Sequence, residues 1–358
     1  MPKLFSAAIL EELRKPLVIR KLEYPKYLDV GHVLVKIKYS GICGAQLNEI
    51  AGVKGPDKFL PHTLGHEGGC EVIATGPGVR NVKIGDHAVV HWRKGAGIDA
   101  TFPKYWCPEL GREIGGGAAT TWNEYALVSE NRLTRIDKSI PLDIAALLGC
   151  AVTTGLGLIG NEAQVRMGQS VVVFGCGGVG LNVIQGAMLA NAYPIIGVDI
   201  KEEKLRAAQA MGATHVCSAL PGTRYGSETG ADIGLGGWLR HFTQGGADIV
   251  VDTTGVPEII KTAWEIAASA GKVHLVAQIP HDKFLPLQTL PMHHGKTIVG
   301  SDGGGTNPTV DIPRYLKLYK VGRLNLKGLI THRCKLVEIN GMLEEICAGK
   351  VSRAIIEL

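Results

Sequence analysis

The stretch that decides the fold is Ser170-Val171-Val172-Val173-Phe174-Gly175-Cys176-Gly177-Gly178-Val179-Gly180. Its apolar run is typical of a strand, and the G-x-G-x-x-G spacing that follows opens a helical pattern, the context in which such glycines bind a dinucleotide. Gly175 permits a tight turn, Gly177 lets a pyrophosphate approach the backbone, and Gly180 allows close packing of helix on strand. The helix N-terminus then supplies amide donors and the positive end of the helix dipole.

An acidic residue completes this pattern. A dinucleotide site needs a carboxylate about 20 residues beyond the glycines to bind the ribose hydroxyls, and Asp199 ends the next apolar run. Asp199 would repel a 2′-phosphate, so NAD is favoured over NADP, although the cations Lys201 and Lys204 lie close by. The alternative interpretation is a glycine-rich turn followed by an aspartate that caps a helix.

The pattern of the chain changes near residue 150. Before it, short strand-like runs at residues 33–39, 71–76 and 86–90 are separated by glycine and proline, which indicates a β-rich domain. After it, strand-like runs alternate with helical patterns, as in a doubly wound parallel sheet. Residues after about 303 should return to the first domain, because so short a piece buries little core by itself. The expected fold class is α/β.

Composition and charge limit the kinds of partner that the chain is expected to bind. The 358 residues carry a net charge of +5 without a run of like charges, which argues against nucleic acid. Mild basicity suits an anionic cofactor or substrate, and ordinary surface chemistry explains it equally well. The eight cysteines are scattered, unlike the framework of a small secreted domain. Residues 1–10 are too short in apolar length for a secretory signal, and no apolar run reaches the roughly 18 residues of a membrane helix. We expect a cytoplasmic protein with no membrane partner.

Three residues upstream of the glycines have the side chains of a zinc site. Cys43 follows a predicted strand, His66 lies in Gly65-His66-Glu67-Gly68, and Cys150 lies at the predicted domain junction. A catalytic zinc takes about three protein ligands of these types and leaves a position open. Each cysteine taken singly is well explained as buried packing. Their joint occurrence beside a dinucleotide domain is what indicates a metal.

At these residues the chain resembles the zinc-dependent alcohol dehydrogenases of the medium-chain dehydrogenase/reductase superfamily. The resemblance covers nearly the whole length and rests on the Gly-His-Glu signature, Gly149-Cys150-Ala151-Val152-Thr153-Thr154-Gly155, the nucleotide stretch with Val198-Asp199, and Val351-Ser352-Arg353-Ala354-Ile355-Ile356. It implies a GroES-like catalytic domain at residues 1–150 and 303–358, interrupted by a Rossmann NAD-binding domain at residues 151–302.

The resemblance also implies the site residues. One catalytic zinc per chain would be bound by Cys43, His66 and Cys150, with Glu67 beside the metal as an occasional fourth ligand. In the cofactor site, Thr154 would touch the nicotinamide, Lys204 the adenosine ribose and Arg353 the pyrophosphate, while Val276-Ala277-Gln278 and Gly300-Ser301 would offer backbone contacts to the carboxamide. Bound zinc acts as a Lewis acid toward an alcohol or carbonyl oxygen, whose carbon exchanges a hydride with the nicotinamide.

The chain departs from the family where the proton is handled. Members commonly have Ser or Thr two residues after the first cysteine ligand and often His three further on, and here these positions are Ala45 and Asn48. Another group, water exchanged through Glu67, or the substrate's own hydroxyl must then carry the proton. Gln46 stands where the family often has an Asp that supports the zinc-binding histidine. A neutral partner donates less electron density through the imidazole, so the zinc should be somewhat more electrophilic, unless Glu49 takes the supporting role.

A second departure lies in residues 90–117. The family's structural zinc lobe needs four closely spaced cysteines, and this stretch contains only Cys107, so a single zinc is expected. The same stretch is rich in aromatic and cationic side chains: His91, Trp92, Arg93, Lys94, Lys104, Tyr105 and Trp106. Such groups suit a sugar, polyol or phosphorylated substrate, and the alternative is a surface loop in a subunit contact. His293 and His294 are expected in a loop.

The sequence therefore predicts a zinc-dependent oxidoreductase that transfers a hydride between NAD(H) and a secondary alcohol or carbonyl, with polyols and sugar derivatives as candidate substrates. The alternative is a lyase or epimerase that uses tightly bound NAD for transient oxidation. A catalytically idle NAD-binding protein is disfavoured, because such a protein needs no ligand trio. The expected assembly is a homodimer or homotetramer.

Overall fold

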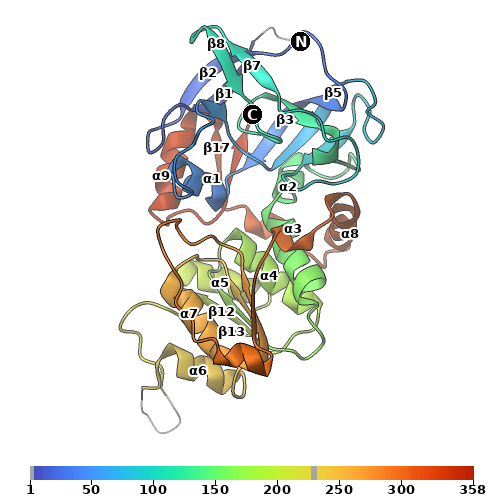
Figure 1. Ribbon diagram of the computed structural model, residues 1–358. Coiled ribbons are helices and arrows are strands. Elements are labelled where there is room, and N and C mark those ends of the chain that lie inside the picture. The colour runs from blue at the N-terminus through green and yellow to red at the C-terminus, as the bar shows by residue number, and fades with distance from the viewer. Residues whose placement is uncertain (1–3, 227–231) are drawn as a thin grey trace. The chain divides into compact units, whose positions relative to one another are not determined.

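The structure is a computed structural model that describes residues 4–226 and 232–358. Residues 1–3, which open the N-terminal stretch considered above, and residues 227–231 lie outside the described parts. The chain forms two compact units: unit 1 comprises Met1–Thr153 with Asn307–Leu358, and unit 2 comprises Thr154–Thr306 (Figure 1).

Unit 1 contains two sheets. One is a closed barrel in the order β1 (Leu4–Leu10), β2 (Val18–Glu23), β7 (Lys104–Cys107), β8 (Arg112–Gly115) and β4 (His62–Thr63). The other has the order β10 (Leu133–Ile136), β6 (His87–Val90), β5 (Gly68–Thr75), β3 (His32–Gly41), β18 (Ala354–Glu357) and β17 (His332–Lys335), and β9 (Tyr125–Ser129) also pairs with β3. This is the β-rich, GroES-like domain that the sequence predicts.

Strand β3 forms because its apolar residues alternate between two cores. Val33, Val35 and Ile37 face one cluster of buried side chains, whereas Leu34 belongs to another, built around Phe5. Successive side chains of a strand point to opposite faces, so one strand serves both clusters. The end of β3 at Gly41 leads directly to Cys43.

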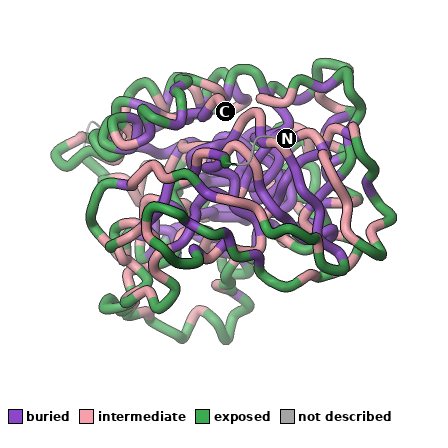
Figure 2. The backbone as a smooth tube through the Cα atoms, turned by 90° about the horizontal axis from the view of Figure 1, so that it is seen from above, coloured by how far each residue is buried: buried purple, intermediate pink, exposed green. Residues whose placement is uncertain are grey.

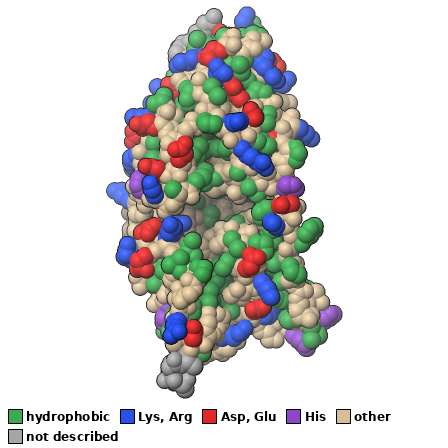
Figure 3. Space-filling view, turned by 90° about the vertical axis from the view of Figure 1, so that its left-hand side faces the viewer, with side chains coloured by type: hydrophobic (Ala, Val, Ile, Leu, Met, Phe, Trp, Pro, Cys, Tyr) green, Lys and Arg blue, Asp and Glu red, His purple; other side chains and the backbone are tan. Residues whose placement is uncertain are grey.

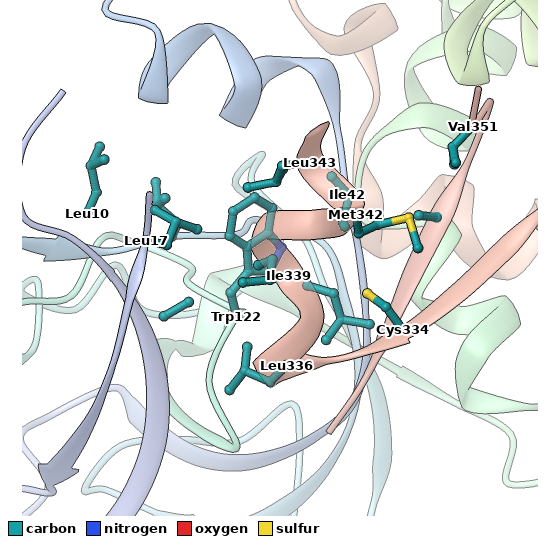
Figure 4. Close-up of a cluster of buried hydrophobic side chains, with 14 residues drawn as sticks. Leu10, Leu17, Ile42, Trp122, Cys334, Leu336, Ile339, Met342, Leu343 and Val351 are labelled. Atoms are coloured by element: carbon teal, nitrogen blue, oxygen red, sulfur yellow. The ribbon is translucent and has the colours of Figure 1, made fainter. Parts of the chain in front are cut away.

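The C-terminal residues share the core of unit 1. Strand β18 pairs antiparallel with β3, with Ile355 opposite Gly41. Helix α9 (Ile339–Cys347) buries Ile339, Met342 and Leu343 in the cluster that holds Trp122 (Figure 4). Their i, i+3, i+4 spacing is the stripe expected of a helix packed on one face.

The described residues of unit 2 are built on a six-stranded parallel sheet. Its strand order is β13 (His215–Ser218), β12 (Ile195–Asp199), β11 (Val171–Phe174), β14 (Ala247–Asp252), β15 (Ala267–Leu275) and β16 (Thr297–Gly300). In chain order this is 3-2-1-4-5-6, the Rossmann order, in which ligands bind where the order reverses beside the first strand. The sheet packs with α4 (Gly178–Leu189), α5 (Glu202–Ala210), α7 (Pro257–Ile266) and, against α7, α6 (Gly234–Phe242) (Figure 1).

Shorter elements complete the units. The remaining helices are α1 (Gly44–Ile50), α2 (Leu142–Leu147), α3 (Ala151–Gly157), α8 (Pro308–Lys320) and the π-helix η2 (Leu158–Ala163). Single 3₁₀ turns are η1 (Glu130–Arg132), η3 (Leu290–His294), η4 (Gly303–Gly305), η5 (Lys327–Leu329) and η6 (Leu336–Glu338). His293 and His294 lie exposed in η3.

The surface agrees with the charge pattern of the sequence. Buried stretches gather in the middle of Figure 2, with exposed loops and helices around them. Lys and Arg side chains are interspersed with Asp and Glu on the face in Figure 3, so that face carries no patch of a single sign. Among the described residues, no helix has the length and apolar character needed to span a membrane.

Candidate active site

Three chain segments of unit 1 bring the predicted zinc ligands together. Cys43 lies between β3 and α1, His66 lies between β4 and β5, and Cys150 directly precedes α3. One ligand atom of each residue lies within 4.8 Å of those of the other two. The two sulfurs are 3.9 Å apart, and two thiolates on one tetrahedral zinc would be separated by about 3.8 Å.

The chemistry of these side chains also fits a zinc ion. Nε2 of His66 is buried without a hydrogen-bond partner among the described residues, as expected of an atom reserved for a metal. The thiol of Cys150 donates a hydrogen bond to Cys43, and this lowers the pKa of the Cys43 thiol well below its ordinary value despite burial. Two sulfurs and an imidazole form the donor set of a catalytic zinc that retains an open position.

Gln46 supports the histidine of this trio. Its side-chain amide on α1 contacts Nδ1 of His66, whereas Glu49 faces His62 instead. Gln46 therefore occupies the supporting position considered above, and Glu49 does not. The atom of Gln46 placed against Nδ1 is the amide nitrogen, and its Oε1 is buried without a partner among the described residues. Metal binding through Nε2 of His66 puts the ring proton on Nδ1, so the amide must be turned over to bring its oxygen to Nδ1 as the acceptor. A neutral amide withdraws this proton less than a carboxylate does.

Glu67 forms a buried ion pair with Arg353. Nη2 of Arg353 donates to Oε2 of Glu67 at 2.6 Å, and Nη1 donates to the carbonyl of Ile42 at 3.1 Å. Burial raises the pKa of Glu67, and the neighbouring guanidinium opposes that rise. Glu67 is absent from the atoms grouped within 4.8 Å around Cys43, so its carboxylate is turned toward Arg353. These two partners of Arg353 were not anticipated from the sequence.

Two glycines make room for Glu67. A Cβ at Gly41 would lie 2.6 Å from Cδ of Glu67 and 2.8 Å from Nη2 of Arg353. A Cβ at Gly149 would lie 2.6 Å from Cα of Glu67. Atoms this close overlap, so both positions require glycine for the ion pair to reach its place.

The predicted nucleotide stretch of unit 2 has the local geometry its glycines suggest. Gly175 has φ +89°, which favours glycine. A Cβ at Gly180 would overlap the carbonyl oxygen of Gly175, whereas a Cβ at Gly177 would meet no atom within 4 Å. Helix α4 begins at Gly178, followed by Val179. The open space therefore lies at the glycine expected to face a pyrophosphate.

Asp199 ends β12 beside this stretch. Its Oδ2 accepts from the amide of Cys176 at 2.8 Å, and its Oδ1 accepts from the amides of Ile200 and Lys201. These bonds hold the carboxylate at the carboxyl edge of the sheet, the edge at which nucleotides bind in this fold. Lys204 lies partly buried in the first turn of α5.

The other cofactor residues have separate places in unit 2. Val276 directly follows β15 and Ser301 directly follows β16, so both lie at the same carboxyl edge as Gly175 and Asp199. Thr154 is buried on α3 rather than at the end of a strand. The sheet thus brings the strand-end residues to one edge.

Residues 90–117 correct one expectation. They include the hairpin β7–β8 of the barrel, not only a surface loop. Tyr105 is fully buried in the core around Phe5, and buried His91 bonds to the carbonyl of Arg93 and to Thr134. A substrate-binding cluster containing His91 and Tyr105 is therefore wrong, because both serve packing.

Comparison with known proteins agrees with this geometry. Residues 29–138 match the family model "Alcohol dehydrogenase GroES-like domain", and residues 178–320 match "Zinc-binding dehydrogenase". An alcohol dehydrogenase class-3 of Cereibacter sphaeroides is 31% identical, with 98% of both chains covered. The chain belongs to the zinc-dependent alcohol dehydrogenase family. An S-(hydroxymethyl)glutathione dehydrogenase of Paracoccus denitrificans is 30% identical over 98% of both chains. The structure of a benzyl alcohol dehydrogenase from Acinetobacter calcoaceticus superposes with a TM-score of 0.87 at 25% identity, covering 100% of both chains.

Membership in this family confirms the predicted class of activity. The protein is an oxidoreductase that acts on CH–OH groups, with zinc and a nicotinamide dinucleotide as cofactors. The two-domain α/β architecture expected from the sequence is confirmed by the same matches and by the sheets described above.

Sequence reasoning missed two features near the ligands. The Glu67–Arg353 pair joins residues 286 positions apart, and no local pattern signals such a contact. A group formed by Glu49, Asp57 and His62 was also missed. Its signal was a histidine preceded by two carboxylates within one short segment.

Proposed function

We propose that this enzyme interconverts an alcohol and its carbonyl compound with NAD(H), at a metal site formed by Cys43, His66 and Cys150. The observation that carries the proposal is the grouping of two sulfurs and one imidazole nitrogen within 4.8 Å, contributed by three separate segments. Zinc bound there supplies a Lewis acid to the substrate oxygen. Two thiolates balance the charge of the ion, and the neutral imidazole leaves it electrophilic.

The surrounding residues position this trio. Gln46 contacts the ring of His66, and Arg353 bonds to Glu67, which follows His66, and to the carbonyl of Ile42, which precedes Cys43. Ala45 and Asn48 on α1 offer neither a hydroxyl relay nor a base. The proton of the alcohol must therefore leave by another route, and Ala45→Ser tests this. An unchanged turnover and pH profile in Ala45→Ser would show that the absent relay has little consequence.

The proposed cofactor is NAD rather than NADP, bound along the carboxyl edge of the unit 2 sheet. Asp199 carries the preference, because its carboxylate is held at the end of β12 where a 2′-phosphate would have to approach. Gly175, Gly177, Gly178, Val179, Gly180, Lys204, Val276, Ser301 and Thr154 are the other proposed contacts in unit 2. The resemblance also assigns Arg353 to the pyrophosphate, and in unit 1 the guanidinium of this residue is bound to Glu67 and to the carbonyl of Ile42. Steady-state kinetics with both cofactors test the preference, and equal kcat/KM values would contradict it.

The proposed substrate is an alcohol or its carbonyl compound, with secondary alcohols, polyols and sugar derivatives kept as the candidates that the sequence predicts. Relatives are named for alcohols and for S-(hydroxymethyl)glutathione, and a solved relative is named for benzyl alcohol. A panel of these compounds with polyols and sugars, followed by NADH absorbance, would rank them. Turnover with cofactor retained on the protein and no net change in NADH would instead support the lyase or epimerase alternative.

Matched cysteine variants test the metal site. Cys43→Ala should lose both the bound zinc and the activity, because two ligands do not retain a catalytic ion. Cys107→Ala is the control, since that thiol is buried in the apolar core of the barrel and belongs to neither group of possible metal ligands among the described residues. The proposal fails if Cys43→Ala keeps its zinc, measured by elemental analysis, or if Cys107→Ala loses it.

We propose that the protein assembles into a homodimer or homotetramer through unit 2. Strand β16 is an edge of the parallel sheet and exposes Val299. An edge strand with an exposed apolar side chain is a template for pairing with another chain. Val299→Lys should reduce the mass measured by light scattering, whereas Ile84→Lys, at an exposed apolar residue of unit 1, should not.

A cytoplasmic location is proposed too, because Cys43 and Cys150 must stay reduced to bind zinc.

A further inference from the structure

We propose that Glu49, Asp57 and His62 form a second binding site for a divalent metal ion in unit 1, separate from the site at Cys43. Glu49 lies on α1, Asp57 in the following loop, and His62 at the start of β4. One ligand atom of each lies within 4.8 Å of the other two. Nε2 of His62 is 2.9 Å from Oδ2 of Asp57 and 3.9 Å from Oε1 of Glu49.

The hydrogen bonding of His62 determines which ring atom faces the carboxylates. Nδ1 lies 2.9 Å from the carbonyl oxygen of Thr63. A carbonyl only accepts, so Nδ1 must carry the proton, and a neutral ring then has its lone pair on Nε2. This is the arrangement by which metal-binding histidines are oriented in proteins.

The lone pair of Nε2 would face an anionic oxygen at hydrogen-bond distance. Two acceptors at such a separation repel each other unless a cation lies with them. That cation is either a second proton on His62 or a metal ion. The nearby Glu49 carboxylate adds another negative charge, which a divalent ion balances better than one proton does.

The carboxylate of Asp57 is already oriented toward His62. Its Oδ1 accepts from the amide of Phe59 at 2.8 Å, so the second oxygen is directed to His62. Burial opposes ionisation, but the Phe59 amide and His62 outweigh it and lower the pKa of Asp57. The carboxylate is therefore charged near neutral pH.

The donor set favours zinc or a similar transition ion. One imidazole nitrogen and two carboxylate oxygens suit zinc, whose ligands in a tetrahedral site lie about 3.3 Å apart. Nε2 of His62 and Oδ2 of Asp57 would separate by a few tenths of an ångström to admit it. The side chain of Glu49 is 35% exposed, so the site is accessible to ions from solvent.

A metal ion bound at Glu49, Asp57 and His62 would cross-link the chain segment that lies between the catalytic ligands Cys43 and His66. Cys43 directly precedes α1, which carries Glu49, and His66 follows His62 on the short path from β4 to β5. A metal at the second site would tie α1 to β4 and close the loop at residues 51–61. We expect binding to raise the thermal stability of the enzyme and not to supply catalysis.

Zinc titration of the full-length enzyme tests this proposal. Enzyme that retains its catalytic zinc is dialysed against buffered zinc at free concentrations from nanomolar to high micromolar. The bound zinc per chain is then measured by inductively coupled plasma mass spectrometry. Wild type should rise from one to two equivalents, with an increase in Tm over the second step. Asp57→Asn and His62→Gln should each lose the second equivalent and its Tm increase while keeping the first.

The control is Asp29→Asn. Asp29 is an exposed carboxylate 3.9 Å from His32, and this pair belongs to no three-residue ligand group among the described residues, so this variant should bind two equivalents like wild type. A Cys43→Ala enzyme should lose only the tighter equivalent, which separates this proposal from that of the catalytic metal. Retention of the first equivalent shows that a variant is folded, and Glu49→Gln provides a third, milder variant.

The proposal is overturned if wild type saturates at one equivalent, or if both Asp57→Asn and His62→Gln still bind two. It is equally overturned if nitrogen-15 NMR shows His62 doubly protonated and unchanged by zinc. In that case a proton alone is the cation between His62 and Asp57.

Discussion

Arg353 and Glu67 lie together inside unit 1, with Nη2 and Oε2 only 2.6 Å apart and side-chain exposures of 6% and 0%. Arg353 immediately precedes β18, and Glu67 immediately follows the metal-site residue His66. The last strand of the chain therefore delivers a cation to the turn that holds a zinc ligand. This contact explains how residues near the C-terminus take part in a site whose ligands lie in the first 150 positions.

Loss of the cation should destabilise the protein strongly. Arg353→Met leaves the buried carboxylate of Glu67 without its partner, and breaking a buried pair in this way costs about 3–5 kcal/mol. Urea unfolding would measure the loss. Lys335→Met is the control, because Lys335 pairs with Glu357 at 2.6 Å on an exposed surface, where solvent screens the charges and loss of the pair should have little effect on stability. Equal effects of the two variants would contradict this account.

The glycines around Glu67 should not tolerate a methyl group. Gly41→Ala brings Cβ to 2.6 Å from the Glu67 carboxyl carbon, so the ion pair must shift, at a cost of about 1–3 kcal/mol. The measurements are unfolding free energy and zinc content. Gly341→Ala on α9 meets no atom within 4 Å and should be neutral or stabilising. A stable Gly41→Ala enzyme with full zinc would show that the site has room to spare.

Alanine substitutions at two glycines of the nucleotide stretch should have different effects, one on cofactor binding and the other on stability. Gly177→Ala finds open space in the protein, so we expect normal stability but nucleotide binding weakened by about tenfold or more, since the methyl group occupies the approach of the pyrophosphate. Gly180→Ala overlaps the Gly175 carbonyl and should reduce stability itself. Thermal unfolding and NADH fluorescence titration distinguish the outcomes. Unaltered NADH affinity in Gly177→Ala would place the cofactor elsewhere.

A buried histidine should make stability depend on pH. Burial, with a contribution from Lys272, lowers the pKa of His274 to about 4, and neither ring nitrogen has a partner among the described residues. The unfolded chain takes up this proton near pH 6.5, so stability present above that pH is lost progressively as pH falls toward 4. His274→Leu should flatten this loss by about 1–3 kcal/mol, measured as urea midpoints across the window. His293→Gln, at an exposed site, should leave the profile unchanged.

Local patterns were sufficient for the architecture. The turn at Gly175 and the close approach at Gly180 depend on residues a few positions apart, and the spacing alone predicted them. Alternation of strands and helices likewise predicted the parallel sheet, because each βαβ unit is a local structure. The three zinc ligands were recognised from short motifs, and the fold then brought them within 4.8 Å.

Long-range contacts were not readable in the same way. Arg353 meets Glu67 only because β18 pairs with β3, a register that no segment near either residue specifies. The hairpin β7–β8 was missed although Lys104-Tyr105-Trp106-Cys107 alternates between exposed and buried positions. There the aromatic and cationic residues suggested recognition of a ligand, whereas tertiary packing buries Tyr105.

That hairpin changes what a metal does for this enzyme. Members of the family commonly bind a structural zinc in this segment through four cysteines. Here the barrel is closed instead by strand pairing, and Tyr105, Cys107 and Ile114 pack in its apolar core. This segment needs no ion to fold. The reaction therefore depends on a bound metal, whereas the folding of the barrel depends on strand pairing and apolar packing. A chelator should therefore silence the enzyme while leaving the far-ultraviolet circular dichroism of its barrel intact, and added zinc should restore activity without a refolding step.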